Sequence, residues 1–110
     1  SFPGLEEDKY HALAEKYMPN GTCGVISFGV PGGREKVSAF LDHLKMVSIA
    51  THVADARSCT LYPAGTTHRQ LTEEQLVEAG VGIDLVRLSC GIENADDIIT
   101  DLDQALAAVQ

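Results

Sequence analysis

The sequence has no long apolar run, and its longest uninterrupted apolar stretches extend over only a few residues. A helix that crosses a membrane needs about 20 consecutive apolar residues, so no membrane partner is expected. Residues 1–8 also have neither the basic start nor the apolar run of a signal peptide. These absences predict a cytoplasmic protein.

Basic residues are scarce, with 8 Lys and Arg against 16 Asp and Glu, and the formal net charge is −8. The four arginines are scattered singly along the chain. A protein with this charge repels the phosphate backbone of nucleic acids. Nucleic acid is therefore not expected as a partner.

Cysteine is also rare, since only Cys23, Cys59 and Cys90 are present. An odd number without close spacing does not fit a disulfide framework or a C-x-x-C zinc site. The four histidines form no H-x-H or H-x-x-x-H pair, so no metal site is expected. We predict that each cysteine is a small buried apolar residue.

What the sequence does contain is the composition of one globular domain: 110 residues, 45% apolar and 22% charged. The chain opens on Ser-Phe-Pro-Gly instead of Met, which resembles a cut point. We therefore expect residues 1–110 to be one domain of a longer protein.

Hydrophobic periodicity predicts four helices and four strands. Thr72 and Gln75 have the spacing of a capping box, which starts a short helix, and Asn94 is a typical N-cap for the last helix. The predicted order is a helix at 8–18, a strand at 24–30, a helix containing 37–44, strands at 46–50 and 58–62, a short helix after 72, a strand at 86–90 and a helix after 94. Amphipathic helices need a sheet to cover, so we expect a two-layer α/β (α+β) sandwich.

Arg87 is the most informative single residue. Val86, Leu88 and Cys90 alternate toward one face of their predicted strand, so Arg87 points to the other face. Its planar guanidinium is suited to binding a carboxylate. The alternative is an ordinary exposed arginine that pairs with a neighbouring acid.

The segment 58–68 is rich in hydroxyl groups and runs from a predicted strand into a turn. Such segments often carry binding groups on a rigid scaffold. They are equally typical of plain turns, because Ser, Thr, Pro and Gly satisfy backbone groups locally. Composition leaves both interpretations open.

Three motifs together carry a family resemblance. Residues 84–93 read Asp-Leu-Val-Arg-Leu-Ser-Cys-Gly-Ile-Glu, residues 56–68 read Ala-Arg-Ser-Cys-Thr-Leu-Tyr-Pro-Ala-Gly-Thr-Thr-His, and residues 2–5 read Phe-Pro-Gly-Leu. They resemble D-L-I-R-L-S-V-G-I-E, E-S-L-x-x-H-P-A-S-x-T-H and Y-P-G-L in the C-terminal domain of the Cys/Met-metabolism family of pyridoxal-phosphate (PLP) enzymes. Residues 94–106 continue the resemblance, which covers essentially the whole chain.

Within that family, residues 52–58 and 67–71 are most similar to the O-acetylhomoserine sulfhydrylase branch. This branch replaces the acetyloxy group of O-acetyl-L-homoserine with sulfide or a thiol and so makes homocysteine or methionine. Cystathionine γ-synthase and methionine γ-lyase share the same small domain and are alternatives. A free-standing amino-acid-binding regulatory module is an alternative from a different class.

The resemblance also implies a fold and a site. The fold is a small, mainly antiparallel sheet with helices on one face, as in the small C-terminal domain of fold-type I PLP enzymes. Arg87 corresponds to the arginine that binds the substrate α-carboxylate, Ser58 to a residue beside that carboxylate and the cofactor, and Thr67 to a position that supports the same pocket. The sequence departs from the family at Tyr62, where the family has His, and at Gly65, where it has Ser.

A PLP enzyme needs a lysine that forms the Schiff base with its cofactor. None of the four lysines follows the Ser-x-[Ser/Thr] lead of the family; they are Lys9, Lys16, Lys36 and Lys45. We therefore expect no catalytic residue and no bound cofactor in this chain, which should be inactive alone. PLP, an amino-acid substrate and a homotetrameric assembly are implied for the full-length parent, whose remaining chain is the expected partner of this domain.

Overall fold

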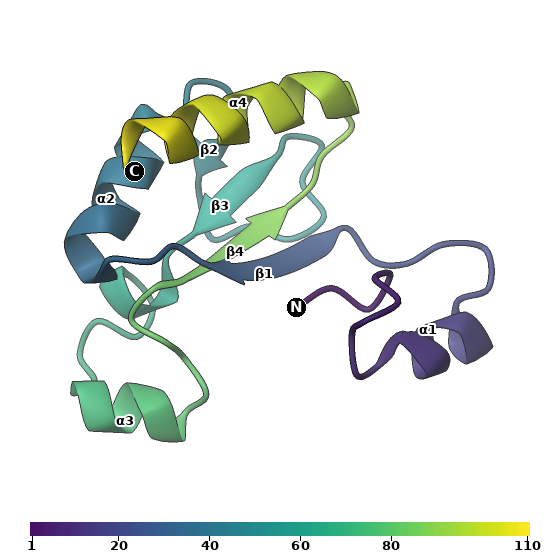
Figure 1. The fold of residues 1–110 in the computed structure, drawn as a ribbon, viewed down its shortest axis with the longest axis horizontal. Coiled ribbons are helices and arrows are strands. Elements are labelled where there is room, and N and C mark those ends of the chain that lie inside the picture. The colour runs from purple at the N-terminus through teal and green to yellow at the C-terminus, as the bar shows by residue number, and fades with distance from the viewer.

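The structure is a computed structural model that describes residues 1–110, and its elements follow the predicted order (Figure 1). They are α1 (His11–Tyr17), β1 (Val25–Gly29), α2 (Gly33–His43), β2 (Ser48–Ile49), β3 (Cys59–Leu61), the 3₁₀ turn η1 (Pro63–Gly65), α3 (Glu73–Glu78), β4 (Leu85–Ser89) and α4 (Ala95–Ala108). Only η1 was not predicted. It begins at Pro63, whose ring fixes a backbone angle that suits the first turn of a helix.

The four strands form one sheet in the order β1-β4-β3-β2. β4 pairs antiparallel with both β1 and β3, whereas the short β2 pairs parallel with β3. Arg87 in the centre of β4 lies opposite Ser27 on one side and Leu61 on the other. The predicted small, mainly antiparallel sheet is therefore confirmed.

Helices α2 and α4 lie together on one side of the sheet, which confirms the two-layer arrangement (Figure 1). The core between the layers contains Val37 and Phe40 of α2, Val86 of β4 and Ala105 of α4, all fully buried. Phe40 meets the ring of Phe28 edge-on, with 6.0 Å between the ring centroids. Burial of these apolar side chains is the main force that holds the two layers together.

Local hydrogen bonds begin the helices where the sequence predicts. The Thr72 hydroxyl and the Gln75 side chain form a reciprocal capping box at the start of α3. The Asn94 side chain accepts a hydrogen bond from the Asp96 N–H at 2.8 Å and caps α4. Both helix starts are thus confirmed.

Helix α1 differs from the prediction that each amphipathic helix covers the sheet. Only Ala14 of α1 is buried, and the apolar stripe that includes Leu13 and Tyr17 is exposed. The helix lies beyond the end of the sheet, where its His11 side chain hydrogen-bonds the carbonyl of Pro3 in the N-terminal segment (Figure 1). The prediction that the helix covers the sheet is therefore wrong for α1, because this helix contacts the N-terminal segment instead.

The cysteines only partly follow their prediction. Cys59 is buried in β3 and Cys90 is half-buried, but Cys23 is exposed in the loop before β1. The buried interpretation is therefore wrong for Cys23, because this loop lies outside the two packed layers. None of the helices is both long and apolar enough to cross a membrane.

Candidate functional site

Arg87 occupies the central strand of the sheet. Its neighbours Val86 and Leu88 are buried on the face that α2 and α4 cover. Side chains alternate along a strand, so Arg87 projects from the opposite face, together with its cross-strand partners Ser27 and Leu61. The alternation predicted from the sequence is confirmed for this strand.

The guanidinium of Arg87 has no partner within the chain. Its Nε is the one buried side-chain nitrogen or oxygen atom that makes no hydrogen bond. Arg57 pairs with Asp55, whereas no ion pair involves Arg87. An unsatisfied buried donor is costly, and carboxylates are the acceptors that form the strongest hydrogen bonds with a guanidinium. The structure thus leaves the guanidinium of Arg87 without an acceptor from residues 1–110.

Ser58 is fully buried just before β3 and takes part in a compact polar cluster. Its hydroxyl donates to Oε2 of Glu93 at 2.8 Å and accepts from the N–H of Gly91 at 2.9 Å. Its own N–H donates to Oε1 of Glu93 at 2.7 Å. The Ser58 N–H and then its hydroxyl lower the pKa of Glu93, so the carboxylate stays ionised in this cluster.

Gly91 completes the same cluster because it brings two backbones close together. A Cβ at this position would lie 2.4 Å from the carbonyl oxygen of Ala56 and 2.5 Å from the carbonyl carbon of Arg57. The next residue, Ile92, donates its N–H to the same Ala56 oxygen at 2.9 Å. The end of β4 is therefore held against the segment that enters β3. Glu93 ends the motif at residues 84–93, but nothing in the sequence pattern marks it as the partner of Ser58, 35 residues away.

Thr67 lies on the exposed loop after η1, where its hydroxyl is 2.8 Å from Nδ1 of His68. No hydrogen bond or ion pair links Thr67, Ser58 and Arg87 to one another. The structure thus places the three predicted site residues on three separate segments. It joins none of them to another by a hydrogen bond or an ion pair.

Tyr62 and Gly65, the two departures from the family motif, lie against each other in the structure. Tyr62 is buried, and its hydroxyl donates to the carbonyl of Ile83 at 2.8 Å. Burial raises the pKa of the Tyr62 phenol. A Cβ at Gly65 would lie only 2.4 Å from Cδ1 of the Tyr62 ring. A side chain at position 65 would therefore overlap the Tyr62 ring unless one of the two moved.

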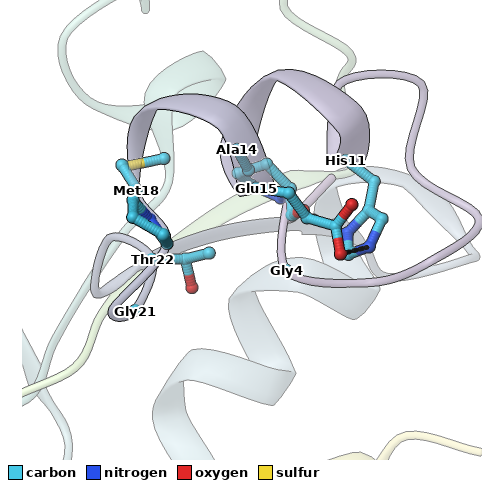
Figure 2. A pocket seen from close by; sticks show the side chains of 9 residues that line it. Gly4, His11, Ala14, Glu15, Met18, Gly21 and Thr22 are labelled. Atoms are coloured by element: carbon cyan, nitrogen blue, oxygen red, sulfur yellow. Dashed lines mark hydrogen bonds and ion pairs between the residues drawn. The ribbon is translucent and has the colours of Figure 1, made fainter.

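A separate hollow of about 350 Å³ lies between the N-terminal segment, α1 and the loop that follows it (Figure 2). Nε2 of His11 lies 3.6 Å from Oε1 of Glu15 on its wall. Gly4 and Thr22 line other parts of it (Figure 2). None of the three predicted site residues lines this hollow.

The lysines and the potential metal ligands of the chain are placed as follows. No lysine lines any hollow of the structure. Lys9 and Lys16 lie over the rings of Tyr10 and Tyr17, and Lys36 donates to the carbonyl of Val109. No three His, Cys, Asp or Glu side chains come together as potential metal ligands. The guanidinium of Arg87, which has no acceptor from the chain, is a group on the sheet that can bind an anion.

Comparison with known proteins adds to this geometry. Residues 1–107 match the family described as Cys/Met metabolism PLP-dependent enzyme. The chain is 45% identical to O-acetyl-L-homoserine sulfhydrylase of Leptospira meyeri and 47% identical to homocysteine synthase of Schizosaccharomyces pombe. Each match covers 96% of this chain but only 24% and 25% of the relative, respectively. The chain thus spans about a quarter of the length of these relatives.

A solved structure shows the same fold. Cystathionine γ-synthase from Xanthomonas oryzae pv. oryzae, in complex with aminoacrylate and cysteine, superposes with a TM-score of 0.87 at 37% identity. The match covers 98% of this chain and 28% of that structure. The small α/β fold expected from the sequence is therefore that of a part of a known PLP enzyme.

Proposed function

Because the chain belongs to the Cys/Met metabolism family of PLP-dependent enzymes, we propose that residues 1–110 form the C-terminal domain of a longer enzyme and bind the α-carboxylate of its substrate. The proposed reaction is γ-replacement on O-acetyl-L-homoserine by sulfide or a thiol. Two relatives named as a sulfhydrylase and a homocysteine synthase support this reaction. Cystathionine γ-synthase activity is the second candidate, because a structure with that name shares the fold.

The observation that carries the proposal is the unpartnered Nε of Arg87 on the open face of the sheet. A carboxylate bound there would supply the missing acceptor and neutralise the guanidinium charge. Holding the carboxylate on a central strand fixes one end of the amino-acid substrate relative to the rest of the enzyme. Such positioning lowers the barrier of the chemical step by removing the freedom of the reactants.

Ser58 and Thr67 would support the carboxylate site without binding the substrate through the guanidinium. Ser58 belongs to a buried cluster at the start of β3, the strand that pairs with β4 beside Arg87. We propose that it lies next to the carboxylate site and helps to hold the surrounding main chain in place. Thr67, on the loop after η1, would support the pocket from a neighbouring segment.

The cofactor belongs to the part of the enzyme outside this chain. PLP supplies the electron-withdrawing group for this class of amino-acid chemistry, and the rest of the parent would provide its lysine and its phosphate-binding loop. A homotetrameric parent is part of the same proposal. The contribution of residues 1–110 is to bind and orient the amino-acid substrate.

Replacing Arg87 in the full-length parent tests the proposal. Loss of a charge-assisted hydrogen bond of about 1.5–3 kcal/mol predicts that Arg87→Ala raises KM for O-acetylhomoserine about 10- to 100-fold. Arg87→Lys keeps the charge but not the planar fork, so we expect only partial recovery. Arg69→Ala is the matched control, since Arg69 is exposed and makes no side-chain hydrogen bond. An unchanged KM in Arg87→Ala would remove Arg87 from the site.

A further inference from the structure

The helix-covered face of the sheet is left incomplete above β1. Ile26 and Phe28 of β1 and Leu88 of β4 form the floor of an apolar hollow of about 260 Å³, and Ile99, Leu102 and Leu106 of α4 form its wall. A second hollow of about 280 Å³ continues it along α4 past Cys90 and Ile98. We call this continuous surface the β1–α4 groove.

The groove exposes side chains that normally pack in a core. Ile99 is 53% exposed, while Ile26 and Phe28 are only half-buried, although they lie on the core face of the sheet. Figure 1 shows α2 and α4 side by side over the sheet, with no third helix beside α4 above β1. A contiguous apolar surface with this shape marks a site of contact with another element.

The shape of the groove favours a helix as its occupant. Its floor is the side-chain face of a sheet, and its wall is a helix of the covering layer, so another helix would extend that layer by ordinary packing. Addition of a strand to the edge of β1 is less favoured. Ser1 already takes part of that edge, because the Ser27 N–H donates to its carbonyl at 3.1 Å.

The acidic charge along the groove bears on where that helix comes from. Asp103 lines the first hollow and Glu93 lines the second, and no Lys or Arg lines either of them. A second copy of the chain, with its net charge of −8, would bring two acidic rims together. About three quarters of the length of the relatives lies outside the matched region and provides another source.

We propose that the β1–α4 groove receives an amphipathic helix, apolar on one face and flanked by basic residues, from the part of the parent polypeptide outside residues 1–110. This inference rests on the proposed place of the chain in a longer enzyme. It does not depend on the carboxylate role of Arg87. The helix would complete the covering layer and fix this domain relative to the rest of the enzyme.

Thiol labelling tests the proposal. Ile99→Cys is prepared in residues 1–110 and in the longer polypeptide, and the rate of its reaction with a maleimide is followed by peptide mass spectrometry, which separates it from the natural cysteines. We expect labelling to be fast in residues 1–110 and at least about 10-fold slower in the longer polypeptide. Asp97→Cys is the control, because Asp97 is exposed on α4 but does not line the groove, and its rate should be similar in both.

Equal labelling rates for Ile99→Cys in the two proteins would overturn the proposal. A rate in residues 1–110 that falls as protein concentration rises, together with a dimer in sedimentation, would make the groove a self-association surface and would also overturn it. Cross-linking from Ile99→Cys to lysines outside residues 1–110 of the same polypeptide would support it. Because no readout uses turnover, this test and the Arg87 test can fail independently.

Discussion

Asp101 on α4 shows how one side chain joins distant segments. Its carboxylate accepts hydrogen bonds of 2.8–2.9 Å from the N–H groups of Lys45, Met46 and Val47, in the turn between α2 and β2. Burial opposes ionisation of Asp101, but these three N–H groups outweigh it, and the pKa of the carboxyl is lowered. The ionised form is therefore the one that holds the turn against α4.

This arrangement predicts how stability changes with pH. A carboxyl whose pKa is lower in the folded state stabilises the fold above its unfolded pKa of about 3.9, and this contribution is lost as pH falls through the folded pKa. Asp101→Ala should lower the free energy of unfolding by about 3 kcal/mol at neutral pH. Urea unfolding between pH 7 and 3 should show a smaller loss of stability in Asp101→Ala than in the unaltered chain.

Asp103→Asn is the control for this comparison. Asp103 lies on the same helix and makes no hydrogen bond through its side chain. We expect it to leave both the stability and its pH dependence nearly unchanged. If Asp101→Ala kept the full pH dependence of the unaltered chain, the titrating group would be elsewhere.

Ser58 gives a second prediction at the residue scale. Ser58→Ala removes the acceptor for the Gly91 N–H and one donor to Glu93 inside the fold. We expect the free energy of unfolding of residues 1–110 to fall by about 1–3 kcal/mol, because polar groups lose their partners in a buried cluster. Ser38→Ala, at an exposed position of α2, should change it little. Equal stability of the two variants would mean that the cluster does not hold the fold.

At the scale of elements, η1 and its neighbours depend on a matched pair of residues. The Tyr62 ring fills the space that a side chain at Gly65 would need. Gly65→Ser alone should therefore destabilise the chain by about 1–3 kcal/mol through overpacking. In Tyr62→His, the smaller ring should make the same Gly65→Ser change less costly.

A double-mutant cycle by urea unfolding measures this coupling between positions 62 and 65. Gly24→Ser is a suitable control, because a Cβ at Gly24 would meet its nearest neighbour, the Cys90 carbonyl oxygen, at an ordinary 3.5 Å. Additive effects of Tyr62→His and Gly65→Ser would show that the two positions vary independently. A coupled result would explain why this sequence departs from the family motif at both positions together.

At the scale of the whole molecule, catalytic turnover distinguishes residues 1–110 from the full-length parent. We predict that residues 1–110, supplied with PLP and sulfide, make no homocysteine from O-acetylhomoserine, because no lysine of the chain lies in a pocket. The full-length parent should make it under the same conditions. Measurable turnover by residues 1–110 would contradict the proposal that the cofactor-binding lysine lies outside this chain.

Calorimetry of residues 1–110 with amino acids addresses the free-standing alternative. As one part of a composite site, Arg87 should bind an isolated amino acid only weakly, because most contacts to the substrate would come from the rest of the parent. Tight binding that Arg87→Ala abolishes would instead favour an independent amino-acid-binding module.

Much of this architecture was predictable because the signals are local. The apolar spacing of α4, the capping box of α3 and the alternation around Arg87 each act within a few residues, and each is confirmed. The motifs also predicted the family. Helical and strand periodicity, caps and short motifs are properties of neighbouring residues, so the order of elements could be determined from the sequence itself.

Only the tertiary structure decided which distant groups meet. Glu93 holds Ser58 across 35 residues, and Asp101 holds the turn at Lys45 across 56. It also decided that α1 leaves its apolar stripe exposed and that Arg87 has a buried nitrogen without a partner. Such pairings depend on strand register and on the packing of layers, in which many weak contacts act together over the whole chain, and no local pattern encodes them.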